Sequence, residues 1–249
     1  MLTAERQGII LDEIEKNGSV TVGYLCEVLG ASESTVRRDL SSLESAGKLK
    51  KVHGGALAAE GKYLHSEAGI EEKISLNSEE KDLIARYAAQ TVNKNDTVFI
   101  DAGTTTEKMA EYITEQGALY VTNGFDAAQI LAKKGLRVYL TGGRVKASTG
   151  ALTGAACVET LKNFNFTKAF LGTNGVSVND GLTTPDAEEA YVKRTAAEKS
   201  YITYVLCDHT KFNVTAAVTF AECRNVCIIT DRLSDSRYAK LTVVKEVSQ

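Results

Sequence analysis

Long hydrophobic runs and a leader-like start are both missing from this sequence. Nowhere do about 18 apolar residues follow one another, the length that a membrane-spanning helix needs. Charged residues, Glu5 and Arg6, stand where a signal peptide has its apolar segment. With 43% hydrophobic and 24% charged residues, the composition is that of a soluble globular protein. We therefore expect a cytoplasmic protein with no membrane partner.

Cysteine and histidine are too scarce and too scattered for a metal site. The five cysteines are spread between Cys26 and Cys227, and the three histidines are His53, His65 and His209. Cys223 and Cys227 have the spacing of half a metal site, but no second Cys or His pair stands at ligand spacing. We expect reduced, mostly buried thiols, no metal and no cofactor.

Several signatures of nucleotide and hydrolase chemistry are also absent. The sequence contains no Gly-x-x-x-x-Gly-Lys-Ser/Thr and no Gly-x-Gly-x-x-Gly, so ATP hydrolysis and NAD chemistry have no support. Gly-x-Ser-x-Gly and His-Glu-x-x-His are missing too, which removes the serine-esterase and zinc-protease interpretations.

The chain as a whole is not basic, but one short stretch is. A net charge of −3 argues against a protein that coats nucleic acid without specificity. Within residues 34–55, however, Asp39 and Glu44 are outnumbered by five basic residues: Arg37, Arg38, Lys48, Lys50 and Lys51.

Residues 1–56 read as three short helices and a hairpin, and we expect them to form one domain. Apolar residues recur at helical spacing around Ile10, Leu25 and Val36, and a Gly30-Ala31 turn separates the second helix from the third. Ser32 or Ser34 can cap the third helix, and Gly47 stands where a left-handed residue would end it. A short basic strand follows over residues 48–53 and closes at Gly54 and Gly55. This order predicts a winged helix-turn-helix.

The third predicted helix has an apolar face, which we expect to be buried, and an opposite face that is rich in basic and hydroxyl side chains. Because this basic face and the basic strand belong to a helix-turn-helix, we expect them to bind duplex DNA in the major groove. The arginines would read base edges, while the hydroxyls and the lysines would hold phosphates. The predicted DNA-binding residues are Ser34, Thr35, Arg37, Arg38, Ser41, Lys48, Lys50, Lys51 and His53.

The rest of the chain predicts a linker and one larger α/β domain. We place the linker at residues 57–77, which include Gly61 and Gly69, and the second domain at residues 78–249. Predicted strands cover residues 97–101, 119–122, 137–141, 168–172, 201–207 and 226–230. Predicted helices begin at residue 78 and cover residues 107–116, 125–134, 154–161 and 187–198, with a loop between residues 172 and 187. Such alternation is typical of a mainly parallel sheet covered on both faces.

Polar turns follow most of these strands, and ligands of parallel sheets sit at the carboxyl ends of the strands. Gly103 allows an anion to approach the backbone, and Thr104 and Thr105 add hydroxyl donors beside a helix N-terminus. We therefore expect a phosphate there, with Lys146, Lys193 or Lys211 neutralising it and Asp101, Asn123 and Asp208 receiving sugar hydroxyls. The predicted effector-binding residues are Asp101, Gly103, Thr104, Thr105, Asn123, Gly142, Gly143, Lys146, Glu189, Lys193, Asp208 and Lys211.

Several stretches together resemble the DeoR family of bacterial sugar-operon regulators. The resemblance rests on residues 32–40, on 52–56, on the polar turns at 101–106 and 122–124, and on residues 208–212. It implies a winged helix-turn-helix joined to a sensor domain similar in fold to ribose-5-phosphate isomerase and CoA-transferases. Residues 170–176 and 181–186 look most like the fructose-operon branch, whose implied effector is fructose 1-phosphate. Many relatives carry a small residue at the position of His209. The lactose-type branch, whose implied effector is tagatose 6-phosphate, has the same Asp-His-Thr-Lys sequence as residues 208–211.

We therefore expect a non-enzymatic repressor of a sugar operon that binds double-stranded operator DNA as a homodimer or homotetramer. Two alternatives remain open. One is a sugar-phosphate isomerase-like or CoA-transferase-like enzyme, with Asp208, His209 or Glu189 as its base and the winged helix as an accessory. The other is a module that uses its winged domain against another protein.

Overall fold

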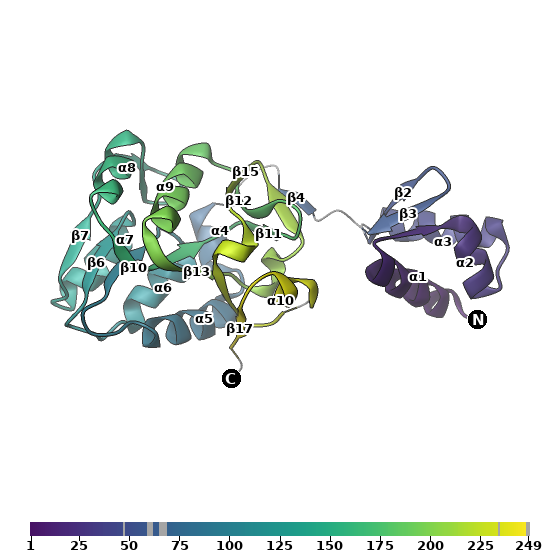
Figure 1. The fold of residues 1–249 in the computed structure, drawn as a ribbon, viewed down its shortest axis with the longest axis horizontal. Helices are drawn as coiled ribbons and strands as arrows, with labels where there is room; N and C mark the ends of the chain where they lie inside the picture. The colour runs from purple at the N-terminus through teal and green to yellow at the C-terminus, as the bar shows by residue number, and fades with distance from the viewer. Residues whose placement is uncertain (47, 59–61, 65–68, 234, 248–249) are drawn as a thin grey trace. The chain divides into compact units, whose positions relative to one another are not determined.

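The computed structural model describes residues 1–46, 48–58, 62–64, 69–233 and 235–247. The chain forms two compact units, Met1–Lys62 and Tyr63–Gln249 (Figure 1). Gly47, Gly61 and His65 lie outside the described residues, and with them the predicted left-handed end of the third helix. The range predicted as a linker, 57–77, contains a strand β4 (Lys62–Leu64) and a helix α4 (Ile70–Ser75).

The first unit is a winged helix-turn-helix, as the residue pattern predicted. Its helices are α1 (Thr3–Asn17), α2 (Val22–Leu29) and α3 (Glu33–Ser45). Its strands are β1 (Ser19–Thr21), β2 (Leu49–Val52) and β3 (Gly55–Ala58), arranged as an antiparallel sheet in the order β1-β3-β2. Ile10, Leu25 and Val36, one from each helix, are fully buried in a shared core.

Local chemistry explains where these elements begin and end. Thr21 caps α2 by accepting a hydrogen bond from the Tyr24 amide at 3.1 Å, and Ser32 caps α3 through the Thr35 amide at 3.4 Å. The tip of the β2–β3 hairpin has Gly54 at φ +85°. At Gly55 the constraint is space, because a Cβ there would lie 2.1 Å from the Val20 carbonyl oxygen of β1.

The second unit contains a seven-stranded parallel sheet in the order β17-β16-β13-β10-β5-β6-β7. The strands are β5 (Thr97–Ile100), β6 (Leu119–Thr122), β7 (Val138–Leu140), β10 (Phe166–Gly172), β13 (Ser200–Leu206), β16 (Cys227–Thr230) and β17 (Val244–Glu246). The helices beside them are α5 (Ser78–Gln90), α6 (Thr104–Tyr112), α7 (Phe125–Lys133), α8 (Ala155–Lys162), α9 (Ala187–Glu198) and α10 (Arg237–Leu241).

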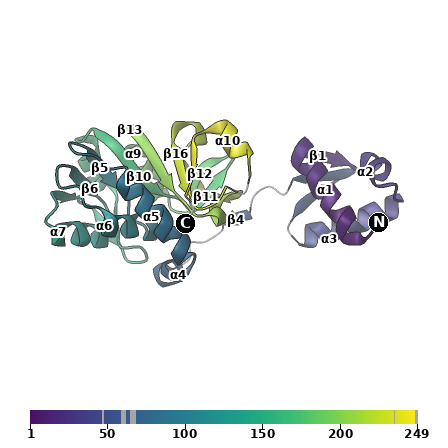
Figure 2. The same ribbon diagram turned by 90° about the horizontal axis from the view of Figure 1, so that it is seen from below.

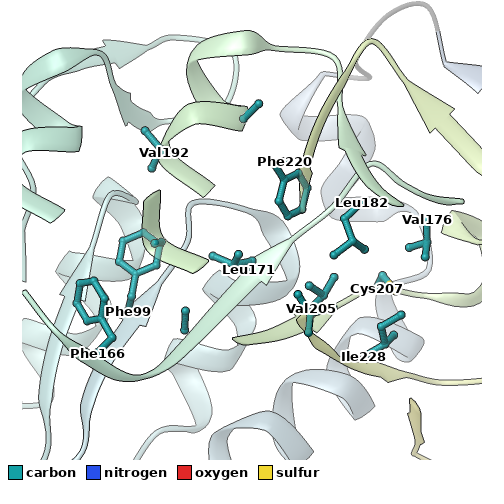
Figure 3. Close-up of a cluster of buried hydrophobic side chains, with 14 of the residues drawn as sticks. Phe99, Phe166, Leu171, Val176, Leu182, Val192, Val205, Cys207, Phe220 and Ile228 are labelled. Carbon is teal, nitrogen blue, oxygen red and sulfur yellow. The ribbon is translucent and has the colours of Figure 1, made fainter. Parts of the chain in front are cut away.

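Helices cover both faces of this sheet, which separates two hydrophobic clusters (Figure 2). Residues of α5, α6 and α7 pack on one face, against side chains such as Phe170 and Leu206. Residues of α8 and α9 pack on the other face, where Figure 3 shows Leu171 and Val205 with Val192 of α9. Successive residues of β10 and β13 thus enter opposite clusters, as alternation along a strand requires.

The second unit also contains small antiparallel sheets beside the parallel sheet, and the sequence pattern did not predict them. The stretch expected to be a loop contains β11 (Gly175–Ser177) and β12 (Gly181–Thr184), which pair with each other, and β12 also pairs with β15 (Val218–Ala221). A hairpin joins β8 (Arg144–Lys146) to β9 (Ala151–Thr153), and β14 (Val214–Ala216) pairs with β4. Two short 3₁₀ turns, η1 (His209–Lys211) and η2 (Cys223–Asn225), complete the described elements.

The strand order places a ligand site. In chain order the parallel strands run outward from β5 to β7, and the chain then returns to the other side of β5 to add β10 and the later strands. The order therefore reverses between β5 and β10. In doubly wound sheets, ligands bind in the crevice at the carboxyl ends of the two strands at such a switch point.

Candidate functional site

The exposed face of α3 presents the predicted DNA-binding side chains. Ser34, Arg37 and Arg38 are exposed, and Thr35 and Ser41 are partly exposed. The Arg37 guanidinium donates to Glu33 one turn earlier, at 2.9 Å from Nε and 2.5 Å from Nη2. Arg38 makes no hydrogen bond or ion pair to any residue that the structure describes. To bind a ligand, Arg37 must therefore break its hydrogen bonds with Glu33, whereas Arg38 has no such contact to break within the described part of the chain.

Opposite this face, a buried ion pair fixes α3 against α1. Asp39 is 3% exposed and accepts from Arg6 Nε at 2.7 Å and from Arg6 Nη2 at 3.3 Å. This contact raises the pKa of Arg6, which stays charged. A two-point contact sets an orientation as well as a distance, so the pair fixes how α3 presents its exposed face.

The wing adds a second basic surface. Lys48, Lys50 and His53 are exposed, while Lys51 is partly exposed and turns toward α3, where its Nζ donates to Ser41 Oγ at 2.8 Å. The Lys51 amide donates to Glu44 Oε1 at 2.9 Å. The structure therefore brings the basic strand and the hydroxyl-rich face of α3 together within one unit.

A cavity lies at the switch point of the second unit, and we refer to it as the switch-point cavity. It has a volume of about 80 Å³, several times the roughly 10–15 Å³ that one water molecule needs. Its walls come from the turns after β5, β10 and β13 and from helices α4, α5, α6 and α9. The lining residues are Ile70, Lys73, Lys81, Ala102, Gly103, Thr104, Thr105, Thr106, Thr149, Gly172, Thr173, Asn174, Glu189, Lys193, Leu206, Cys207, Asp208 and Lys211.

The N-terminus of α6 opens into this cavity. Gly103 precedes the first helical residue, Thr104, and no side chain caps the helix start. The first backbone N–H groups of a helix have no partner within the helix and carry a partial positive charge. With the hydroxyls of Thr104 and Thr105 beside them, they form a set of donors suited to an oxyanion.

Lysines supply positive charge around the same cavity. Lys193 is 4% exposed and forms an ion pair with Asp101, whose Oδ2 also accepts from the Gly172 amide at 3.0 Å. Lys81 is also 4% exposed, and its ammonium donates to the Lys73 backbone carbonyl. Burial lowers the pKa of Lys81, while the charge of Asp208 raises it. Among the described residues, neither Lys81 nor Lys211 has a carboxylate within ion-pair distance.

Two carboxylates complete the cavity wall. Asp208 is 1% exposed, and its Oδ1 accepts from Asn77 Nδ2 and from the Thr210 amide, both at 3.0 Å. Glu189 Oε1 accepts from Lys146 at 3.0 Å and from Thr149 at 3.1 Å. Each carboxylate keeps a second oxygen for which no hydrogen bond is recorded among the described residues.

Seven of the predicted effector-binding residues line the switch-point cavity and five do not. Asn123, expected to meet a sugar, is 2% exposed and uses its amide to accept from the Ala102 N–H at 2.9 Å and to donate to the Leu152 carbonyl at 3.2 Å. Asp101 lies behind Lys193, and Lys146 pairs with Asp186 at 3.0 Å. Gly142 and Gly143 lie in the turn before β8, where a Cβ on Gly143 would lie 2.4 Å from the Thr153 carbonyl oxygen. These five residues shape the surroundings of the cavity.

Lys81 is the clearest cavity residue that the sequence analysis missed. It stands three, four and seven residues before Ile84, Ala85 and Ala88, which are all fully buried. A charged residue in the buried stripe of an amphipathic helix is the signal that would have identified it.

His209 was an open question as a possible acid or base. Its Nδ1 lies 2.6 Å from Asp231 Oδ2, and its amide donates to Asp231 Oδ1 at 2.7 Å. It is not among the residues that line the switch-point cavity. The pair holds the η1 turn to the end of β16, next to Lys211.

Two family descriptions match the chain. "DeoR-like helix-turn-helix domain" matches residues 6–62, and "DeoR C terminal sensor domain" matches residues 76–232. The chain belongs to the DeoR family of transcriptional regulators. This confirms the family resemblance that the sequence motifs indicated.

Relatives of this DeoR-family protein match it along nearly the whole length of both chains. "Uncharacterized HTH-type transcriptional regulator FruR" of Bacillus subtilis is 41% identical and covers 99% of each chain. "Lactose phosphotransferase system repressor" of Staphylococcus epidermidis is 36% identical over 95% of this chain and 97% of its own. "HTH-type transcriptional repressor GlcR" of Bacillus subtilis is 31% identical over 97% and 93%.

Among solved structures, ribose 5-phosphate isomerase A from Neisseria gonorrhoeae aligns with 53% of this DeoR-family chain and 52% of its own, at 15% identity and a TM-score of 0.40. That likeness is too weak for any conclusion about function. No helix within the described residues is long and apolar enough to cross a membrane. Nor do three or more His, Cys, Asp or Glu side chains gather as a metal site in the described parts of the chain.

Proposed function

We propose that this protein is a sequence-specific repressor of a sugar-utilisation operon, and that a phosphorylated sugar in the switch-point cavity changes its affinity for operator DNA. One observation carries the effector proposal. The uncapped N-terminus of α6 meets a cavity with two lysines, Lys81 and Lys211, that have no carboxylate partner among the described residues. Lys81 is buried, and its ammonium donates to the neutral backbone carbonyl of Lys73. A buried cation that is not balanced by an opposite charge is costly, and an anion relieves that cost.

The DNA-binding roles follow from exposure and geometry. Arg37 and Arg38 are the proposed base-reading residues, because a guanidinium can donate two hydrogen bonds to a guanine edge. Ser34, Thr35, Ser41, Lys48, Lys50, Lys51 and His53 are the proposed phosphate contacts. Operators with two-fold symmetry match symmetric proteins, so we propose a homodimer or homotetramer as the DNA-binding form.

In the effector cavity, Gly103, Thr104, Thr105 and Lys211 are proposed to hold the phosphate. Glu189, Lys193 and Asp208, which line the same cavity, are proposed to bind sugar hydroxyls. Fructose 1-phosphate is the first candidate effector, because residues 170–176 and 181–186 resemble the fructose branch and the relative at 41% identity is named FruR. Tagatose 6-phosphate is the second candidate, because residues 208–211 are shared with the lactose branch and a lactose phosphotransferase repressor is 36% identical.

The deciding experiment is a titration of operator DNA with the full-length protein against a panel of phosphorylated ketoses. We expect one of them to change operator affinity by about 5- to 150-fold, which corresponds to a coupling of roughly 1–3 kcal/mol. Identical binding curves with every member of the panel would rule the effector proposal out.

The enzyme alternative is tested in the same preparation. Asp208, Glu189 and His209 were the candidate bases, and each has an oxygen or nitrogen engaged by neighbouring groups. Incubation with ketose and aldose phosphates should yield no interconversion. Turnover at an enzymatic rate would show that regulation is not the protein's only activity.

A further inference from the structure

Helix α4 buries little of its surface against the rest of the second unit and makes a polar contact with Lys81. None of its residues is buried, and Ile74 and Leu76 are about half exposed, at 51% and 48%. Ile70 and Lys73 nevertheless line the switch-point cavity. The segment 69–77 is therefore a weakly packed part of the cavity wall, in the stretch of chain that leads back to the DNA-binding unit.

One polar contact runs from Lys81 to α4. The buried Lys81 ammonium donates to the backbone carbonyl of Lys73, in the last turn of α4. Burial lowers the pKa of Lys81, and Lys211, Lys73 and Lys108 lower it further, while the charge of Asp208 opposes them. A neutral carbonyl is thus the partner of a buried cation that faces an anion cavity. An oxyanion adds charge–charge attraction to the hydrogen bond, so it is a better partner for the ammonium than this neutral carbonyl.

A second polar contact runs from Asn77, directly after α4, to the other wall. Asn77 has a left-handed backbone, with φ +51°, and its Nδ2 donates to Asp208 Oδ1 at 3.0 Å and to Thr210 Oγ1 at 3.3 Å. Asp208 lines the cavity as Lys81 does. Each of these two contacts to segment 69–77 therefore involves a side chain that lines the cavity.

We propose that Lys81 is the residue through which an anion in the switch-point cavity releases helix α4. An entering phosphate oxygen draws the Lys81 ammonium away from the Lys73 carbonyl, and α4 loses this polar contact. The inference rests on the proposed function, since it assumes that the cavity receives a phosphorylated ligand. Beyond the proposed function, it identifies Lys81 as the residue that detects the ligand and segment 69–77 as the part of the chain that loosens.

The test is hydrogen–deuterium exchange of the full-length protein, read on peptides that cover residues 69–77. Exchange is measured without ligand, with inorganic phosphate and with fructose 1-phosphate, while calorimetry measures the binding of each compound. We expect the bound ligand to speed exchange of the Lys73 and Leu76 amides by about fivefold or more, because losing a single hydrogen bond changes an opening equilibrium by about that factor.

Three variants separate the proposed role from general destabilisation. Lys81→Met removes the ammonium and keeps the length of the side chain, so segment 69–77 should exchange fast without ligand and no faster with it. Asn77→Ala removes the second contact from a partly exposed position and should raise basal exchange while leaving a further ligand response. Lys133→Met is the matched control, because Lys133 is exposed on α7 and does not line the cavity, and it should behave as the wild type.

The outcomes are distinguishable. If calorimetry shows binding and exchange at residues 69–77 does not change, the Lys81 proposal is wrong and the proposed function stands. If exchange rises but operator affinity is the same with and without ligand, the proposed function fails and the Lys81 proposal stands. If inorganic phosphate, fructose 1-phosphate and every other member of the phosphorylated-ketose panel fail to bind, both proposals fail. Unchanged basal exchange in both Lys81→Met and Asn77→Ala would also contradict the proposal, because the contacts would then not be holding α4.

Discussion

Arg37 and Arg38 are neighbours in the sequence but have different surroundings on α3. Arg37 is engaged by Glu33, although both side chains are more than half exposed, and such a surface pair contributes about 0–1 kcal/mol. Arg38 has no partner among the described residues, so it is ready to meet a base edge. The exposed Lys50 lies on the wing, where a single ammonium suits a phosphate better than a base.

These surroundings predict a difference in sequence discrimination. Arg38→Ala should weaken operator binding by about 1–3 kcal/mol and affect random DNA less, because it removes a base contact. Lys50→Ala should weaken both DNAs by similar factors, because a phosphate carries no sequence information. Fluorescence anisotropy with the two duplexes measures this, and equal losses for both variants on both DNAs would contradict base reading by Arg38.

Thr104 and Lys211 are the residues whose loss should silence the effector response. Thr104→Ala removes a hydroxyl at the start of α6, and Lys211→Ala removes a cation that no described carboxylate neutralises. Either variant should bind operator DNA as the wild type does without effector, yet fail to respond to the phosphorylated sugar. Lys108→Ala serves as the control for a lost charge near α6. An unchanged dose-response curve in both variants would remove these residues from the site.

At the scale of elements, the glycine at the start of β3 decides how the wing attaches to the helices. Gly55→Ala should destabilise the first unit by about 1–3 kcal/mol, because strand β1 would have to move away from the new methyl group. Gly8→Ala is the matched control. Its helical position has open space around the glycine, so it should stabilise α1 by about 0.5–1 kcal/mol. Thermal unfolding of both variants measures the effects, and similar stabilities would refute the steric argument.

The contact between α10 and β11 predicts a pH dependence. The Tyr238 hydroxyl lies 2.8 Å from the Val176 carbonyl oxygen, to which it donates, and it accepts from the Asn213 amide at 3.0 Å. Burial raises the pKa of Tyr238 to about 12, above the usual value of about 10. A raised folded-state pKa means that the stabilisation is complete below about pH 10 and is lost as the pH rises toward 12.

Tyr238→Phe should therefore lower the stability of the second unit by about 1–3 kcal/mol at neutral pH, since it leaves the Val176 carbonyl and the Asn213 amide without this partner. The variant should also lose less stability than the wild type between pH 10 and 12. Urea unfolding across that range measures both effects, with Tyr201→Phe as the control because Tyr201 is 89% exposed. Parallel stability curves for the wild type and Tyr238→Phe would contradict the argument.

Elements whose residues alternate or repeat clearly were predictable, and elements set by tertiary contacts were not. The core stripes of α2, α3 and α5 and most parallel strands followed from apolar spacing. Helix α6 was expected at residues 107–116 but spans Thr104–Tyr112. Its three threonines are weak helix formers, so propensity hid the true start. At its end the Lys134 ammonium donates to the carbonyls of Ala110 and Ile113, a tertiary contact that local sequence does not reveal. Strands β11 and β12 are buried throughout and show no alternation, so nothing in their sequence distinguished them from a loop.

The candidate site was predictable in position and less so in detail. The rule that ligands lie at the carboxyl ends of parallel strands brought Gly103, Thr104 and Asp208 to one place. It did not separate polar residues that face the cavity from those that support it. Asn123 and Asp101 also directly follow strands, but their side chains accept hydrogen bonds from the backbone N–H groups of Ala102 and Gly172. They therefore support the site and do not line the cavity.

On the scale of the whole molecule, the net charge is −3, so the chain as a whole does not attract the DNA backbone. Any electrostatic attraction to a DNA duplex must therefore come from a local basic surface. If DNA is the partner, the logarithm of the binding constant should fall with the logarithm of salt concentration with a slope of about −0.9 per neutralised phosphate. Titrations at several salt concentrations measure the slope. A slope near zero would instead favour the alternative in which the winged unit binds another protein.

The strand order has a consequence for synthesis of the chain. Strand β5 lies in the middle of the finished sheet, yet its neighbour β10 is translated some 70 residues later. While the ribosome completes α8, the β5-β6-β7 half carries an apolar strand with an open edge, the kind of edge that pairs with other chains. That edge of β5 stays open until residue 172 has left the exit tunnel. β10 then covers it and presents its own free edge until β13 is made.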